Sequence, residues 1–336
     1  MKRKLLRIAS CLITLSLIAL GVHRLNSILT PIDEVRAYQQ INTFHHLPKN
    51  SVEVIVYGSS HAYRSVVPMQ MYRDYGIAAY NYGMSTQRIN TTTLFVKDSL
   101  LTQKPKLAII ETYFINNTRH DIDMTLDIAY TRYLNVKGPV LKYLRKCFGN
   151  SLEQYLSYFL PICAFHENWN TLTEDHFDHS RLESLFLKTM GFKESTETTE
   201  VTLYTKPKKE SRLREGSVKA MDEIVEACAE SGTEVLFLTV PYSKEDGFPY
   251  GEALKKYASE HGCAYLNLFE YIDDLGLDTS VDFSDAGHLN NNGAAKLTSF
   301  LSQYIASHYQ LSDARLVPGN LWERIDQGQV TGISDI

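Results

Sequence analysis

The sequence predicts an α/β protein, built as a doubly wound parallel sheet of about five strands with a largely helical insertion and preceded by one N-terminal transmembrane helix. Short apolar segments rich in β-branched residues alternate with helical segments, which is typical of a parallel sheet covered on both faces. An apolar stretch follows a basic N-terminus. Between the third and fourth expected strands, about a hundred residues rich in Tyr, Asn, His and charge are too long for a simple connection.

The expected elements follow one another along the chain in a regular alternation. Strands are expected over 52–57, 77–82, 106–112, 233–240 and 263–268, and helices over 68–74, 85–101, 217–231, 251–261 and 292–307, with Ser85 as a cap and further helical fragments near 138–160 and 181–190. With right-handed crossovers, the carboxyl ends of the strands form the ligand-binding edge. The segments expected to meet there are Gly58–Ser60, Asn81–Gly83, Glu111–Tyr113 and Pro241–Tyr242.

Composition excludes several classes of protein. The 336 residues carry a formal net charge of -5, which gives no indication of nucleic-acid binding. None of the five cysteines forms a CxxC pair, so a zinc ribbon or a thioredoxin motif is not expected. Buried free thiols are favoured for Cys228 and Cys263, and a disulfide is the alternative.

The N-terminus has the pattern of a membrane segment. MKRK precedes the apolar stretch Leu5 to Val22, which places the N-terminus in the cytoplasm and exports the remainder. An uncleaved signal anchor is favoured because no small-x-small cleavage site stands out, and a cleaved signal peptide is the alternative. The expected organisation is an anchor over 1–24, a polar connector over 25–50, the main domain over 51–310 with its insertion at about 113–215, and a polar C-terminal tail over 311–336.

A Gly-Ser turn ends the first expected strand in the stretch VEVIVYGSSH, residues 52 to 61. A buried strand that ends in such a turn and feeds a helix exposes one hydroxyl beside the free N–H groups of the helix N-terminus. This arrangement suits a nucleophile. The alternative is an ordinary strand-to-helix connection with a serine N-cap.

A second motif, DFSDAGHLNNNG, precedes the last expected helix. Asp285 and His288 stand three residues apart, which suits a carboxylate that orients an imidazole, which in turn accepts a serine proton. The alternative is a polar loop with Asn292 as a helix cap.

Together the two motifs resemble the SGNH (GDSL-like) hydrolase superfamily, whose fold is a flavodoxin-like doubly wound sheet. Ser60 matches the serine of the first block and Gly83 the glycine of the second, and the last block is matched by Asp285, His288, Asn290 and Gly293. The resemblance implies that Ser60 is the nucleophile, His288 the general base and Asp285 its orienting carboxylate. It further implies that the Ser60 and Gly83 amides bind the oxyanion.

Two departures from the family pattern matter. Ser59 stands where family members usually have aspartate, and this GSS start resembles cell-surface relatives of D-alanyl lipoteichoic acid transfer and polysaccharide O-acetylation proteins. The Gly-x-Asn-Asp block is absent, so the third oxyanion donor is open among Asn116, Gln87 and a backbone amide. His61, Gln87 and Tyr113 are expected to bind substrate. His61 is also an alternative base, although His288 is favoured.

The N-terminal pattern and the resemblance together predict a single-pass protein of the cell membrane with an extracytoplasmic catalytic domain. We expect a serine acyltransferase or esterase that acts on O-acyl groups, O-acetyl above all, of cell-envelope glycans. Such an enzyme needs no cofactor and no metal. Its partners would be an envelope polysaccharide or another acylated envelope polymer, and a membrane-bound acyltransferase is a further candidate. The alternatives are a plain surface carbohydrate esterase and a catalytically silent scaffold that binds envelope polymer or a membrane acyltransferase.

Overall fold

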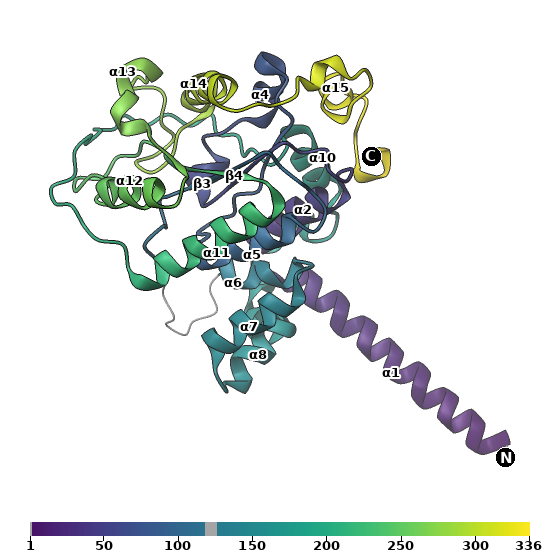
Figure 1. The fold of residues 1–336 in the computed structure, drawn as a ribbon. Helices are drawn as coiled ribbons and strands as arrows, with labels where there is room; N and C mark the ends of the chain where they lie inside the picture. The colour runs from purple at the N-terminus through teal and green to yellow at the C-terminus, as the bar shows by residue number, and fades with distance from the viewer. Residues whose placement is uncertain (1, 118–125) are drawn as a thin grey trace.

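The computed structural model describes residues 2–117 and 126–336, and its centre is one parallel five-stranded sheet (Figure 1). The strands are β1 (Val54–Tyr57), β2 (Ala79–Asn81), β3 (Leu107–Glu111), β4 (Glu234–Thr239) and β5 (Ala264–Asn267), in the order β2-β1-β3-β4-β5. All five expected strands are present and slightly shorter than predicted. Their apolar side chains are almost all buried, and each fully buried Val, Ile or Leu contributes about 1.5–3 kcal/mol.

Helices cover both faces of the sheet. On one face α5 (Ile89–Ser99) packs beside α11 (Glu215–Ser231), and on the other α4 (Pro68–Tyr75) packs beside α14 (Asn291–His308) (Figure 1). The helix α12 (Gly251–Glu260) precedes β5. The doubly wound α/β fold predicted from the sequence is therefore confirmed, with the flavodoxin-like strand order.

The start of α5 differs from the prediction. Ser85 does not cap this helix, which begins at Ile89 with Arg88 at the N-cap position. Thr86 between them has a φ of 54°, a left-handed conformation that cannot continue into an α-helix.

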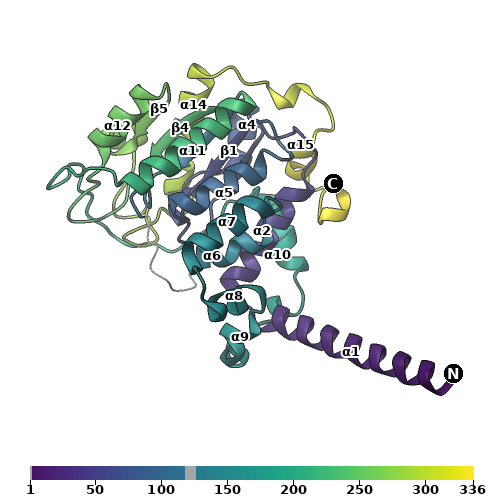
Figure 2. The same ribbon diagram turned by 60° about the horizontal axis from the view of Figure 1, so that its bottom comes forward.

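The N-terminal helix α1 (Lys2–Leu29) projects away from the domain (Figures 1 and 2). Residues 3–29 form a helix that is long and apolar enough to cross a membrane, and none of its 18 most apolar consecutive residues is buried. Length and composition alone support this, and a signal sequence has the same properties.

Residues 25–50 are not the polar connector that the sequence predicts. Ile32–His46 forms helix α2, and its side chains Ala37, Ile41 and Phe44 pack into the main core. Polar composition was misleading because the buried polar side chains are paired: Glu34 accepts hydrogen bonds from Arg132 and Tyr133.

The segment between β3 and α11 is largely helical where the structure describes it. Its helices are α6 (Leu126–Tyr130), α7 (Lys137–Phe148), α8 (Leu152–Phe159), α9 (Ile162–Phe165) and α10 (Ser180–Thr189), with the 3-10 turns η1 (Thr131–Tyr133), η2 (His166–Asn170) and η3 (Glu174–His176). The helical fragments expected near 138–160 and 181–190 are therefore found. Part of the insertion, 118–125, lies outside the described residues.

The C-terminal segment packs on the edge of the sheet instead of forming a polar tail. Helix α15 (Leu321–Asp326) buries Leu321, Trp322 and Ile325, and the Trp322 indole N–H donates to the Ala79 carbonyl of edge strand β2 at 3.1 Å. An exposed strand edge invites pairing with other chains, so this cover protects β2. Short elements complete the chain: α3 (Ser60–Tyr63), α13 (Ile272–Leu275), η4 (Leu268–Tyr271), η5 (Ala314–Leu316) and η6 (Ile333–Asp335).

Candidate active site

The turn after β1 places two adjacent serines differently. Gly58 has a φ of 142°, and a Cβ there would lie 2.6 Å from the Glu111 Cβ, so only glycine fits. Ser59 is buried and caps helix α3, whereas Ser60 is partly exposed at the first position of that helix. Of the two, only Ser60 is reachable by a substrate.

Ser60, His288 and Asp285 form a hydrogen-bonded chain. The Ser60 Oγ lies 2.7 Å from His288 Nε2, and His288 Nδ1 lies 2.9 and 3.0 Å from the two carboxylate oxygens of Asp285. Because a carboxylate can only accept, Nδ1 carries the proton and Nε2 is free to accept the serine proton. This is the geometry of a nucleophile, a general base and its orienting carboxylate.

The loop around His288 is fixed by its own hydrogen bonds. Gly287 N–H donates to Asp285 Oδ1 at 2.7 Å, and Ser243 N–H beyond β4 donates to the Ala286 carbonyl at 2.7 Å. Partial burial alone would raise the pKa of Asp285, but the hydrogen bonds from His288 and Gly287 outweigh it and lower that pKa below its usual value. Asp285 therefore stays ionised beside His288.

Asp282, the other aspartate before His288, has a structural role. Its carboxylate is 1% exposed and accepts from Lys296 Nζ at 2.6 Å and from the Asp278 N–H at 2.7 Å. Asn290 caps α14 by accepting from the N–H groups of Asn292 and Gly293, so Asn292 is not the cap. Both contacts anchor the loop that carries Asp285 and His288.

A second polar network lies beneath the nucleophile turn. Glu111, at the carboxyl end of β3, accepts hydrogen bonds from the Ser59 N–H at 3.0 Å, the Ser59 hydroxyl at 2.7 Å and the Tyr113 N–H at 2.5 Å. The Ser59 Oγ in turn lies 3.2 Å from His61 Nδ1. Glu111 therefore occupies the junction of β1 and β3, the switch point at which folds of this strand order bind ligands.

Burial disfavours charge on both ends of this network. It raises the pKa of Glu111 to about 7, even though hydrogen bonds from Ser59 and Tyr113 oppose the shift. Burial, together with the nearby His288, holds the pKa of His61 well below its ordinary value. His61 is therefore neutral.

His61 lies at the centre of an aromatic cluster beside the triad. Its ring stacks on Tyr113 with centroids 3.7 Å apart, meets Tyr242 edge-on at 5.5 Å, and lies 4.9 Å from the His288 ring. Its Nε2 is buried, and no hydrogen-bond partner for it exists among residues 2–117 and 126–336. The substrate contacts that the sequence predicts for His61 and Tyr113 stay predictions.

The expected oxyanion donors differ in what they contact. Within the described residues, the Ser60 N–H has no acceptor. The Gly83 N–H donates to Asn81 Oδ1 at a rather long 3.2 Å, and the Gly83 carbonyl is held by Gln40 of α2. A Cβ at Gly83 would lie 2.9 Å from the Ala62 Cβ, so glycine is required where this loop meets α3.

Asn116 and Gln87 are occupied away from the triad. Asn116 accepts from the Arg214 N–H and the Ser217 hydroxyl and donates to the Arg212 carbonyl, at the start of α11. Gln87 is buried and donates to Thr92 of α5. These contacts do not favour Asn116 as the third oxyanion donor or Gln87 as a substrate contact, and both roles stay predictions.

A cavity of about 370 Å³ is lined in part by Tyr113. Its lining combines aromatic side chains with cationic and amide groups: Tyr113, Phe114, Asn116, Asn117, Arg214, Tyr242, Lys244, Phe248, Pro249 and Tyr250. Tyr113 and Tyr242 belong both to this cavity and to the His61 cluster. The cavity therefore adjoins the His61 cluster, which in turn lies beside the triad.

The structure also shows what sequence reasoning missed. The sequence predicts that Glu111 lies at the ligand edge but gives it no role, because its contact with Ser59 depends on the register of β1 against β3. Two histidines outside the site are also held by the fold: His45 contacts Asp98 at 2.7 Å, and His176 is buried. Among the described residues, no group of three His, Cys, Asp or Glu side chains could hold a metal ion, and all five cysteines are free thiols.

Comparisons with known proteins add little to this geometry. A scan against protein-family models finds no match, and a search of curated proteins finds none either. Among solved structures, the chain is similar to a Bacteroides fragilis protein described as a "putative acylhydrolase". The identity is 12%, the alignment covers 79% of this chain and 93% of the other, and the TM-score is 0.38.

Proposed function

We propose that this chain is a membrane-anchored serine acyltransferase or esterase of the SGNH type, which acts on O-acyl groups of cell-envelope glycans. The observation that carries the proposal is the Ser60–His288–Asp285 chain at the carboxyl edge of the sheet. Its parts come from positions more than two hundred residues apart in the sequence. The chain of contacts matches the roles that the SGNH resemblance implies for these three residues.

In the first half-reaction, Ser60 Oγ attacks the acyl carbonyl carbon while His288 Nε2 accepts the hydroxyl proton. Asp285 holds the imidazole in the required tautomer and stabilises the imidazolium that forms. The carbonyl oxygen becomes an oxyanion, toward which the free Ser60 N–H can donate. When the intermediate collapses, the ester C–O bond breaks and His288 gives its proton to the departing alkoxide, which leaves an acyl-Ser60.

In the second half-reaction, an acceptor hydroxyl attacks the carbonyl carbon of the acyl-Ser60 and gives its proton to His288. The bond between that carbon and Ser60 Oγ then breaks, and His288 returns the proton to Ser60 Oγ. When the acceptor is water the reaction is hydrolysis, and when it is a sugar hydroxyl the reaction is transfer. Transfer needs a bound acceptor whose effective concentration exceeds that of water. The cavity beside Tyr113, with its aromatic and cationic lining, is the candidate acceptor site.

The proposed location follows from the N-terminal helix. If α1 stays attached, the catalytic domain is held outside the cytoplasm at the membrane surface, close to envelope polymers and to acyl donors that a membrane-bound acyltransferase presents. The full chain should then stay in the membrane pellet after alkaline extraction. A shortened soluble form beginning near residue 24 would contradict the anchor.

A fluorophosphonate probe tests the catalytic part of the proposal. The full chain in detergent should be labelled covalently, and peptide mass spectrometry should place the label on Ser60. Ser60→Ala should lose the label while keeping its thermal unfolding temperature, because the side chain is partly exposed. A folded wild-type chain that takes no label would support the alternative of a catalytically silent scaffold.

A further inference from the structure

An uncovered apolar surface lies where α1 leaves the domain. Helix α8 exposes Leu152, Leu156 and Phe159 at positions i, i+4 and i+7, which puts them on one side of the helix. Leu160 follows them and is also exposed. On the other side of α8, Tyr158 is buried against Phe148.

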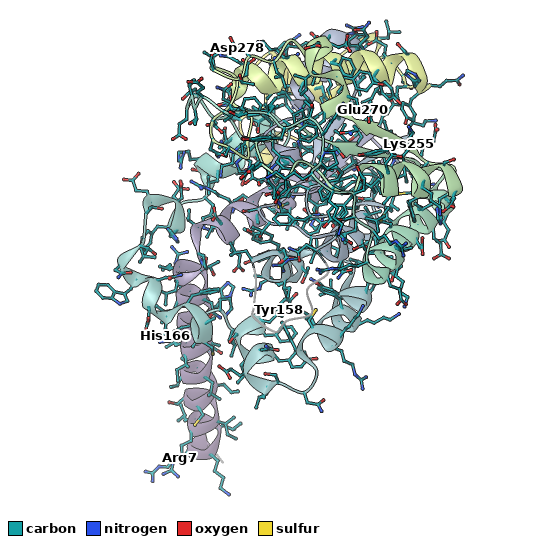
Figure 3. All side chains as sticks on the ribbon, turned by 90° about the vertical axis from the view of Figure 1, so that its left-hand side faces the viewer. Arg7, Tyr158, His166, Lys255, Glu270 and Asp278 are labelled. Atoms are coloured by element: carbon teal, nitrogen blue, oxygen red, sulfur yellow. The ribbon has the colours of Figure 1, made fainter. Side chains whose placement is uncertain are left out.

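This surface continues through α9 and η2 to the base of α1. No residue of α9 is buried, and Trp169 of η2 is 69% exposed. The Ile162 N–H donates to Asn26 Oδ1 at 2.8 Å, and Asn168 Nδ2 donates to the Leu29 carbonyl at 3.2 Å. Figure 2 shows α8 and α9 beside the carboxyl end of α1, and Figure 3 shows His166 of η2 next to the same helix.

The length of α1 fixes the level of this surface relative to a bilayer. A helix needs roughly 20 residues to cross the hydrocarbon core. Counted from Leu5, such a span ends near Arg24, and the side chains become partly covered by the domain from Asn26 onward. Asn26, and therefore its partner Ile162, would lie at the outer membrane boundary.

We propose that α8, α9 and η2 form a membrane-contacting surface that lies in the headgroup region of the leaflet into which α1 passes. The proposal rests on the attachment of α1 and not on the acyl-transfer activity. At this depth, leucine, phenylalanine and tryptophan side chains contact lipid acyl chains and glycerol groups instead of water. Burial of this apolar surface in the membrane favours one orientation of the catalytic domain over free rotation about α1.

The charged side chains near this surface contribute only modestly to the proposed contact with lipid. Helix α7 exposes Arg145, which would be attracted to anionic lipid headgroups, whereas its Lys142 and Lys146 line a cavity against α5 and α11. Glu153 and Glu167 are exposed acidic residues on the same surface and oppose part of that attraction. The apolar stripe therefore carries the proposed contact, and anionic lipid should strengthen it modestly.

Two tryptophans make a direct test possible. The chain contains only Trp169, on the proposed surface, and Trp322, which is 2% exposed under the sheet edge. The full chain is reconstituted into vesicles of phosphatidylcholine and phosphatidylglycerol, with or without bromine on the upper acyl chains. Trp169 should lose most of its emission in brominated vesicles and resist aqueous acrylamide. The Trp169→Phe variant, which retains only the buried Trp322, should show no bromine quenching, and its emission should resist acrylamide in vesicles and in detergent alike.

A matched pair of double variants separates the surface from the anchor. Leu156→Gln with Phe159→Gln should abolish quenching of Trp169 by brominated lipid, while the chain stays in the alkaline-extracted pellet. Leu316→Gln with Val317→Gln, at positions at least as exposed but in the C-terminal segment, should leave the quenching unchanged. Equal Trp169 emission in plain and brominated vesicles would overturn the proposal.

Discussion

Two carboxylate–histidine arrangements lie beside the candidate nucleophile, and they differ in almost every respect. Asp285 contacts His288 directly on a partly exposed loop, where the carboxylate is 54% exposed and stays ionised. Glu111 reaches His61 only through the Ser59 hydroxyl, in a site where all three side chains are buried. In the first pair, the ionised carboxylate can stabilise a positive charge on the imidazole. The second disfavours charge on both partners.

This difference indicates different chemical roles for His288 and His61. His288 must become an imidazolium during the reaction, which a direct ionised carboxylate favours. His61 is held neutral, so it serves as a hydrogen-bonding group instead of a base. Its tautomer depends on Ser59. When Ser59 donates to an ionised Glu111, His61 Nδ1 donates to Ser59, and Nε2 is left as an acceptor.

The largest expected effect is the loss of the direct base. His288→Ala should lower kcat by roughly 10⁶-fold, as removal of the base does in serine hydrolases, while His61→Ala should cost far less. Steady-state kinetics on an activated acetyl ester would measure both. Equal losses, or a larger loss for His61→Ala, would show that the two histidines have been given the wrong roles.

The next effect separates the two aspartates of the His288 loop. Asp285→Asn should lower kcat by about 10⁴-fold because the amide favours the wrong imidazole tautomer. Asp282→Asn should leave kcat within about tenfold but lower the free energy of unfolding by about 1–3 kcal/mol, because it weakens the buried contact with Lys296. Kinetics and thermal unfolding of both variants check this, and the reverse ranking of kcat would refute the assignment.

A smaller effect concerns the pH dependence of stability. The pKa of Glu111 is raised to about 7 in the folded protein, so folding retains a proton that the unfolded chain releases near pH 4.5. This group therefore stabilises the fold fully below pH 4.5, and its contribution falls as pH rises to about 7. Relative to the always neutral Glu111→Gln, the wild type should lose stability across that range, as measured by denaturant unfolding. A pH-independent difference would contradict the raised pKa.

The smallest expected effect is on acceptor use. His61→Gln keeps a polar side chain in the cluster but loses the stacking on Tyr113. It should raise the KM for a sugar acceptor by roughly tenfold, the value of one hydrogen bond, with little change in formation of the acyl-enzyme. A change confined to acylation would instead place His61 in the first half-reaction.

The sequence predicted the parts of the site that are encoded locally. The VEVIVYGSSH strand and turn, and the Asp285-x-x-His288 spacing, each depend on neighbouring residues, and both lie where they were expected. Glu111 could be placed at the sheet edge but not assigned, since its partner Ser59 is fixed by strand register. The predictions for helix α2 and the C-terminal segment were wrong because both are polar in overall composition. Each nevertheless has apolar side chains, such as Trp322, that pack against residues distant in the sequence, and local sequence does not identify those partners.

The most direct test of the account is the fate of an acetyl group on Ser60. The full chain is acetylated with an activated acetyl ester, and envelope oligosaccharides are then added at increasing concentration. The account predicts that one acceptor speeds deacylation and appears acetylated at a hydroxyl, and that Ser60→Ala abolishes both. Release of acetate alone, at a rate no glycan changes, together with rapid deacetylation of acetylated glycan, would contradict transfer and identify the protein as an esterase.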